Sequence, residues 1–128
     1  MAHVHANIGI DNYRVAIRAG EHQLTADEPP RNGGSDAGPA PYELLLSSLA
    51  ACTVITLRMY AQRKRWDLQG VEADARFMRE GDREHIERSL RLAGNLNAEQ
   101  RTRLADVAER TPVTLTLKRG LEIKTTVS

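Results

Sequence analysis

Apolar and polar positions alternate over residues 4–26 of the chain. The alternating apolar positions are Val4, Ala6, Ile8, Ile10, Tyr13, Val15 and Ile17. A period of two residues is typical of strands with one buried face. Asp11-Asn12 and Ala19-Gly20-Glu21 interrupt this pattern at the places where turns are expected. The pattern therefore predicts an antiparallel meander of three short strands, the third around Leu24.

Residues 42–65 have the pattern of a helix. They contain no glycine or proline and are rich in Leu, Ala, Met, Gln and Arg, which are compatible with a helix. The first half is apolar on nearly every side, which predicts a helix buried on several sides. The apolar stretch Leu44–Leu57 is shorter than the roughly 20 residues that span a bilayer, so we expect no membrane association.

Alternation returns after Gly70 in two runs of residues separated by Glu80-Gly81-Asp82, which predicts a second hairpin. Arg88 falls on the apolar face of the second run, so the hairpin is not expected to be uniformly buried. Residues 121–127 alternate again and predict a last strand.

A second helix is expected between this hairpin and the last strand. Asn97 and Gln100 have the spacing of a capping box, and the apolar stripe that follows ends near Thr111-Pro112. Strands and helices thus come in blocks, which predicts an α+β fold with a mainly antiparallel sheet around the long central helix. We expect one domain over residues 1–128, and a homodimer, because one small sheet cannot cover a helix that is apolar all round.

Composition argues against several classes of function. The 18 Lys and Arg residues nearly balance 17 Asp and Glu, and aromatic residues make up 4%, so we expect no nucleic-acid partner. The N-terminus lacks the pattern of a secretory signal, and we expect a cytoplasmic protein. The four histidines do not have the spacing of a zinc site, so we expect no metal and no cofactor.

The single cysteine, Cys52, is the residue with the most informative chemistry. It lies in the middle of the predicted helix, and without a second cysteine it cannot form an intrachain disulfide. A lone cysteine commonly behaves as a small buried hydrophobe, whereas a reactive one needs a nearby cation and an opening for substrate. The loop of residues 27–41, rich in Gly and Pro, carries Arg31 and could supply both. Glu43 suits the helix dipole and lies on the side of a regular helix opposite Cys52.

Two stretches of the sequence resemble the OsmC/Ohr family of thiol hydroperoxide reductases. They are Gly33-Gly34-Ser35-Asp36-Ala37-Gly38-Pro39-Ala40-Pro41-Tyr42-Glu43-Leu44-Leu45-Leu46 with Leu49-Ala50-Ala51-Cys52-Thr53, and the later Thr111-Pro112-Val113. The resemblance implies an intertwined homodimer with two sites at the subunit interface.

The resemblance also implies roles for individual residues. Cys52 matches the cysteine that attacks the peroxide, and Arg31 is the best match for the assisting arginine, with Arg14 and Arg18 as alternatives. The family's assisting glutamate directly follows the proline, where this chain has Tyr42, and Glu43 comes one position later. Tyr42 and Leu49 are expected to contact the substrate.

The family's resolving cysteine corresponds to Thr111, so the dithiol cycle cannot run in this chain. Two hypotheses follow. One is a peroxidase with a single cysteine that reduces organic hydroperoxides and relies on an external thiol. The other is a catalytically degenerate member of the family that serves as a small-molecule binding or interaction module.

Overall fold

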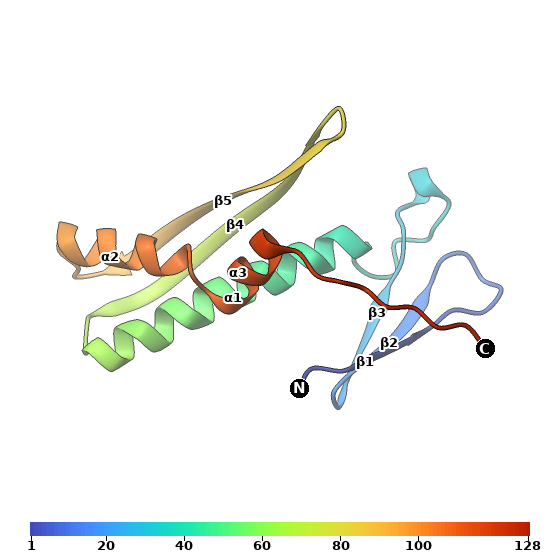
Figure 1. Cartoon of the computed structure of the whole chain (residues 1–128), viewed down its shortest axis with the longest axis horizontal. Coiled ribbons are helices and arrows are strands. Elements are labelled where there is room, and N and C mark those ends of the chain that lie inside the picture. The colour runs from blue at the N-terminus through green and yellow to red at the C-terminus, as the bar shows by residue number, and fades with distance from the viewer. The chain divides into compact units, whose positions relative to one another are not determined.

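The computed structural model describes all 128 residues, which group into two compact units, Met1–Leu45 and Leu46–Ser128. The boundary between them falls inside the long helix α1 (Pro41–Lys64). All strand pairs are antiparallel, which confirms the predicted α+β class (Figure 1). A single domain over residues 1–128 stays a prediction.

The first unit contains a sheet of three strands in the order β1-β2-β3, namely β1 (Val4–Asn7), β2 (Val15–Ala19) and β3 (His22–Ala26). The predicted meander is therefore confirmed. Gly20 and Glu21 form the two-residue turn between β2 and β3, and Gly20 has a φ of +61°. Glycine reaches this left-handed region without a steric penalty, which explains its place in the turn.

The connection between β1 and β2 differs from the prediction. The pair Asn7 and Ala16 is the last in the register, so a loop of residues 8–14 replaces the tight turn expected at Asp11-Asn12. Ile8 and Ile10 lie outside the strand, and Ile10 is fully exposed. The alternation of apolar and polar residues shows which residues are suited to a strand. The end of β1 is instead determined by the last residue that pairs with β2.

Helix α1 begins and ends with recognisable caps. Pro41 occupies the first helical position, and the Ala40 N–H donates to Glu43 Oε1 at 2.8 Å, as in one half of a capping box. At the other end, Arg65 adopts a φ of +60°, and the Trp66 N–H donates to the Ala61 carbonyl at 2.9 Å. This is the geometry of a Schellman motif, here with arginine in the left-handed position.

The second unit joins a long hairpin to two shorter helices. Strands β4 (Leu68–Glu80) and β5 (Arg83–Gly94) are connected by the two-residue turn Gly81–Asp82, as predicted. Helix α2 (Ala98–Ala108) begins with the predicted capping box of Asn97 and Gln100. Helix α3 (Pro112–Arg119) follows Thr111 directly, where the sequence pattern predicts only the end of the preceding helix.

The core of the second unit lies between α1, the hairpin and α2 (Figure 1). It consists of Leu57 and Ala61 from α1, Leu68 from β4, and Leu104, Val107 and Ala108 from α2. Several apolar side chains of the hairpin, among them Val71, Leu90 and Leu92, pack against this cluster.

Helix α1 is buried along one face only. Leu49, Thr53, Leu57 and Ala61 are buried, whereas Ile55 and Met59 are 51% and 58% exposed. The expected burial on several sides is thus wrong within one chain, because the hairpin and α2 both pack around the same buried stripe of α1. The helix is long and apolar enough to cross a membrane by length and composition, a weak criterion that core helices of soluble proteins also meet.

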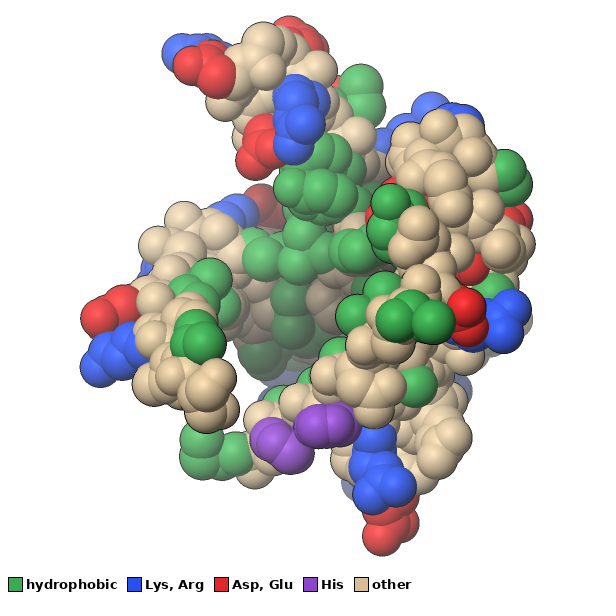
Figure 2. All heavy atoms as spheres, turned by 90° about the vertical axis from the view of Figure 1, so that its right-hand side faces the viewer, with side chains coloured by type: hydrophobic (Ala, Val, Ile, Leu, Met, Phe, Trp, Pro, Cys, Tyr) green, Lys and Arg blue, Asp and Glu red, His purple; other side chains and the backbone are tan.

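The predicted last strand is also wrong. Residues 121–128 have no regular secondary structure, and Leu121, Ile123 and Val127 are 72%, 84% and 92% exposed. The segment has the alternation of a strand, but no strand of this chain pairs with it. Figure 2 shows hydrophobic side chains at the surface among charged and polar ones.

Candidate functional site

Cys52 lies on α1 at the edge of the buried helix face. Its side chain is half-buried, and its Sγ is 4.0 Å from Thr56 Oγ1, one helical turn later. At about 100° per residue, Cys52 lies between the buried Leu49 on one side and the exposed Met59 on the other. A molecule that covered the exposed face of α1 would therefore also reach the thiol.

The other predicted site residues fall into the two units. Arg31, in the short 3-10 helix η1 (Pro30–Asn32), belongs to the first unit with Tyr42 and Glu43, and all three are exposed. Leu49, Cys52 and Thr111 belong to the second. Glu43 acts as a cap for α1, in agreement with the local role that its position in the first turn suggests. Its assisting role, and that of Arg31, stay predictions.

A buried carboxylate fixes the loop that carries Arg31. Asp27 is 2% exposed, and both of its oxygens accept backbone hydrogen bonds. The four donors are the N–H groups of Tyr13 at 3.2 Å, Glu28 at 2.7 Å, Ser35 at 3.2 Å and Ala37 at 3.0 Å. The loop also packs closely on itself, since a side chain at Gly34 would collide with the Glu28 carbonyl and one at Gly38 with the Thr25 carbonyl. These contacts tie together the backbone on both sides of Arg31.

The Asp27 carboxylate makes the stability of the loop depend on pH. The hydrogen bond from Ala37 is the largest cause that lowers the pKa of Asp27 below 3.8, partly opposed by burial. A folded pKa below the unfolded one means that the stabilisation is present at neutral pH and is lost as the pH falls through the folded pKa.

We therefore expect Asp27→Asn to lower the urea midpoint at pH 7, because an amide offers one acceptor oxygen where the carboxylate offers two. The difference from the wild type should shrink as the pH falls below 3.8. Urea unfolding between neutral and acid pH measures both effects. Asp36→Asn, an exposed carboxylate in the same loop, is the matched control. Equal midpoints for wild type and Asp27→Asn at pH 7 would contradict the assignment.

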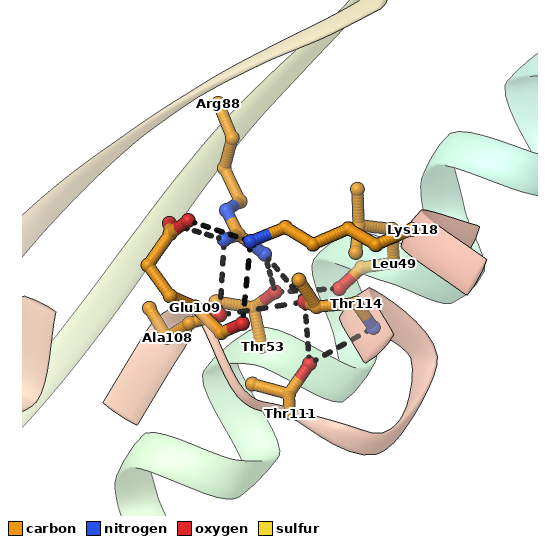
Figure 3. Close-up of polar contacts among 8 residues, drawn as sticks. All are labelled: Leu49, Thr53, Arg88, Ala108, Glu109, Thr111, Thr114 and Lys118. Carbon is orange, nitrogen blue, oxygen red and sulfur yellow. Dashed lines mark hydrogen bonds and ion pairs between the residues drawn. The ribbon is translucent and has the colours of Figure 1, made fainter. Parts of the chain in front are cut away.

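Arg88 is the centre of a polar cluster in the second unit (Figure 3). Its side chain is 11% exposed and joins α1, the end of α2 and the start of α3. The guanidinium donates to Thr53 Oγ1 at 2.9 Å, Thr114 Oγ1 at 3.0 Å, the Ala108 carbonyl at 3.0 Å and a Glu109 carboxylate oxygen at 3.2 Å. A buried charge is tolerated when its donors are satisfied in this way.

Thr111, at the predicted position of the resolving cysteine, belongs to the same network. It is fully buried and caps α3, and its hydroxyl lies 2.7 Å from Thr114 Oγ1 and 3.3 Å from the Thr114 N–H donor. Through Thr114 and Arg88 it is connected to Thr53, the residue next to Cys52 in the sequence.

The sequence pattern places Arg88 on the apolar face of the hairpin but does not predict its partners. Nor does the pattern predict a role for Lys118, whose Nζ contacts the Glu109 carboxylate at 2.9 Å. The hydrogen bond from Lys118 is the largest cause that lowers the pKa of Glu109, and the charge of Arg88 adds to it. Threonine followed by proline is a helix start signal, and at Thr111-Pro112 it would have predicted α3 and brought Thr114 and Lys118 onto one helix. No group of three or more His, Cys, Asp and Glu side chains is arranged to hold a metal ion.

The fold and the sequence around Cys52 define a member of a known class. The family described as OsmC-like protein matches residues 33–126. The chain therefore belongs to the OsmC-like family, as the sequence resemblance predicted.

Several solved structures share the fold. An OsmC-like protein from Mycoplasma pneumoniae is 20% identical with a TM-score of 0.79, over 92% of this chain and 87% of that one. An organic hydroperoxide resistance protein OsmC from Legionella pneumophila is 17% identical with a TM-score of 0.70, over 92% and 89%. The organic hydroperoxide resistance protein OhrB of Bacillus subtilis is 21% identical with a TM-score of 0.61, over 91% and 90%. No curated protein matches the chain.

Proposed function

We propose that this protein is a homodimeric thiol peroxidase that reduces organic hydroperoxides through Cys52 and is regenerated by an external thiol. The observation that carries the proposal is the place of Cys52, half-buried at the edge of the covered face of α1 in an OsmC-like chain. Two proteins of the same fold are named for organic hydroperoxide resistance.

The proposed reaction uses one sulfur atom and two electrons. The Cys52 thiolate attacks a peroxide oxygen, the O–O bond breaks, and the alkoxide takes a proton and leaves as an alcohol. The thiol becomes a sulfenic acid, and an external thiol then forms a mixed disulfide with Cys52 and releases water. A second external thiol restores the Cys52 thiol and leaves as the disulfide of the reductant. Arg31 is expected to stabilise the thiolate and the developing alkoxide.

The first test is the reaction of the reduced protein with cumene hydroperoxide in a stopped-flow instrument. We expect rapid consumption of the peroxide and, by mass spectrometry, the addition of one oxygen atom at Cys52. The proposal fails if neither process is faster than with free cysteine.

A second candidate function is binding without turnover. The observation that favours it concerns Thr111, which the family resemblance matches to the resolving cysteine and whose hydroxyl is already bonded to Thr114. In that case the protein would keep the fold and its cavities but would not consume peroxide, an outcome that the stopped-flow experiment distinguishes from the first.

The proposed dimer has its own physical support. The exposed apolar side chains of α1 and of residues 121–127 would be covered by a second copy of the chain. Light scattering at micromolar concentration should give a mass near twice 14.2 kDa. Ile55→Arg should shift the mass toward the monomer, whereas Glu99→Arg, at an exposed position of α2, should not. A monomer mass for the wild type would contradict the dimer.

Restoring a second thiol should change the reaction. If Thr111 occupies the resolving position, Thr111→Cys should form an intrachain disulfide with Cys52 after peroxide treatment and speed turnover with dithiol reductants. The loss of the threonine cap of α3 is expected to cost about 1 kcal/mol, which folding should survive.

Thiol titration and non-reducing mass spectrometry would detect the new disulfide. Thr102→Cys adds a thiol on the exposed side of α2 and serves as the control. Two free thiols in a folded Thr111→Cys protein, after peroxide has oxidised a control dithiol, would mean that Thr111 is not the resolving position.

A further inference from the structure

The second unit contains a cavity of about 640 Å³ beside the Arg88 cluster. Its lining contains both apolar and charged side chains. Cys52 does not line this cavity. The apolar ones are Leu49, Phe77, Ile86 and Leu117, and Arg88, Lys118 and Glu109 provide charged groups. An apolar cavity with a few convergent polar groups is the usual form of a small-molecule site.

Two cations in this cavity share one carboxylate. Arg88 Nη2 lies 3.2 Å from Glu109 Oε2, and Lys118 Nζ lies 2.9 Å from Glu109 Oε1. The two remaining charged or titratable lining groups have partners of their own, since Glu84 is paired with Arg79 and His85 with Glu87. Within the triad, two cations therefore face a single carboxylate.

The side chains of this triad differ in how firmly they are held. Arg88 is 11% exposed and is fixed by Thr53, Thr114 and the Ala108 carbonyl, whereas Glu109 is 60% exposed. Glu109 can rotate into solvent, and its departure would leave one donor on each cation facing the cavity. Two donors at this separation match the two oxygens of a carboxylate, since a carboxylate occupies them now.

We infer that this cavity binds an amphipathic monocarboxylate, whose acid group replaces Glu109 between Arg88 and Lys118 and whose hydrocarbon chain lies along the apolar lining. Two cations that share one carboxylate suit a ligand with a single acid group in its place. The largely buried guanidinium strengthens the interaction, because charge-assisted hydrogen bonds gain strength away from water. The inference does not depend on the peroxidase activity proposed for Cys52.

The test is calorimetric titration of the full-length protein with octanoate, and with octanol as the uncharged probe of equal chain length. We expect octanoate to bind and octanol to bind about 10-fold more weakly or not at all. Lys118→Met should weaken octanoate binding about 10-fold, because one of the two donors is lost. Glu109→Gln should tighten it about 3-fold or more, because the competing carboxylate is removed.

Arg119→Met is the matched control, because it removes a neighbouring exposed cation that does not line the cavity. It should leave octanoate binding unchanged. The inference is overturned if octanoate does not bind, if octanol binds as tightly, or if Glu109→Gln weakens octanoate binding. A protein that binds octanoate but consumes no peroxide would support the cavity assignment and contradict the peroxidase, and the converse result would do the reverse.

Discussion

Cys52→Ser is expected to lower the consumption of cumene hydroperoxide by the protein at least about 100-fold. Cys52 is the only cysteine in the chain, and the proposed step removes two electrons from its sulfur atom. A serine hydroxyl is not ionised at neutral pH and cannot be oxidised to the equivalent of a sulfenic acid. Stopped-flow measurement with a thiol reductant present would give the rate for each protein.

The same substitution should leave the fold intact. The Cys52 side chain is half-buried, and its one polar contact is the 4.0 Å approach to Thr56, so we expect the free energy of unfolding to change by less than about 1 kcal/mol. Thr102→Ser, at an exposed position of α2, is the control for a substitution to serine away from the thiol. A folded Cys52→Ser protein that still consumed peroxide at the wild-type rate would contradict the proposed role of the thiol.

Arg88→Met is expected to reduce the free energy of unfolding by about 2–4 kcal/mol. Methionine fills much of the same volume but donates no hydrogen bond. The hydroxyls of Thr53 and Thr114 and the carbonyl of Ala108 would each lose a charged donor in a buried place. Urea unfolding followed by circular dichroism would measure the loss.

The neighbouring Arg91 offers a matched control on the same strand. Its side chain is 84% exposed and its ion pair with Glu72 spans 3.6 Å, so Arg91→Met should change stability by less than about 0.5 kcal/mol. Arg88→Lys should restore only part of the stability, because a lysine cannot serve acceptors on both sides of a planar guanidinium. Equal losses for Arg88→Met and Arg91→Met would show that the cluster does not stabilise the unit.

Most elements of the fold could be predicted because their signals are local. The Asn97 and Gln100 capping box, the turn at Gly81–Asp82 and the absence of Gly and Pro from the α1 interior each act over a few residues. Local preferences of this kind determine where helices begin and where hairpins reverse.

The errors arise where structure depends on distant parts of the chain. Arg88 is separated from Thr53, Thr114 and Ala108 by 35, 26 and 20 positions, so no short pattern could place them together. The alternation of residues 121–127 predicts a strand, but alternation specifies only which side chains share a face and supplies no neighbouring strand to pair with. The same limit applies to Arg31 and Cys52, which the sequence connects through family resemblance alone.

The two-stranded ribbon of β4 and β5 has a consequence for every measurement of stability. Each strand has only the other as a partner, so both outer edges expose backbone N–H and C=O groups along strands of 13 and 12 residues. If strands of a second copy of the chain pair with those edges, folding and dimerisation become a single coupled equilibrium that depends on protein concentration. The apparent melting temperature would then rise with protein concentration, and variants could be ranked only at equal protomer concentration.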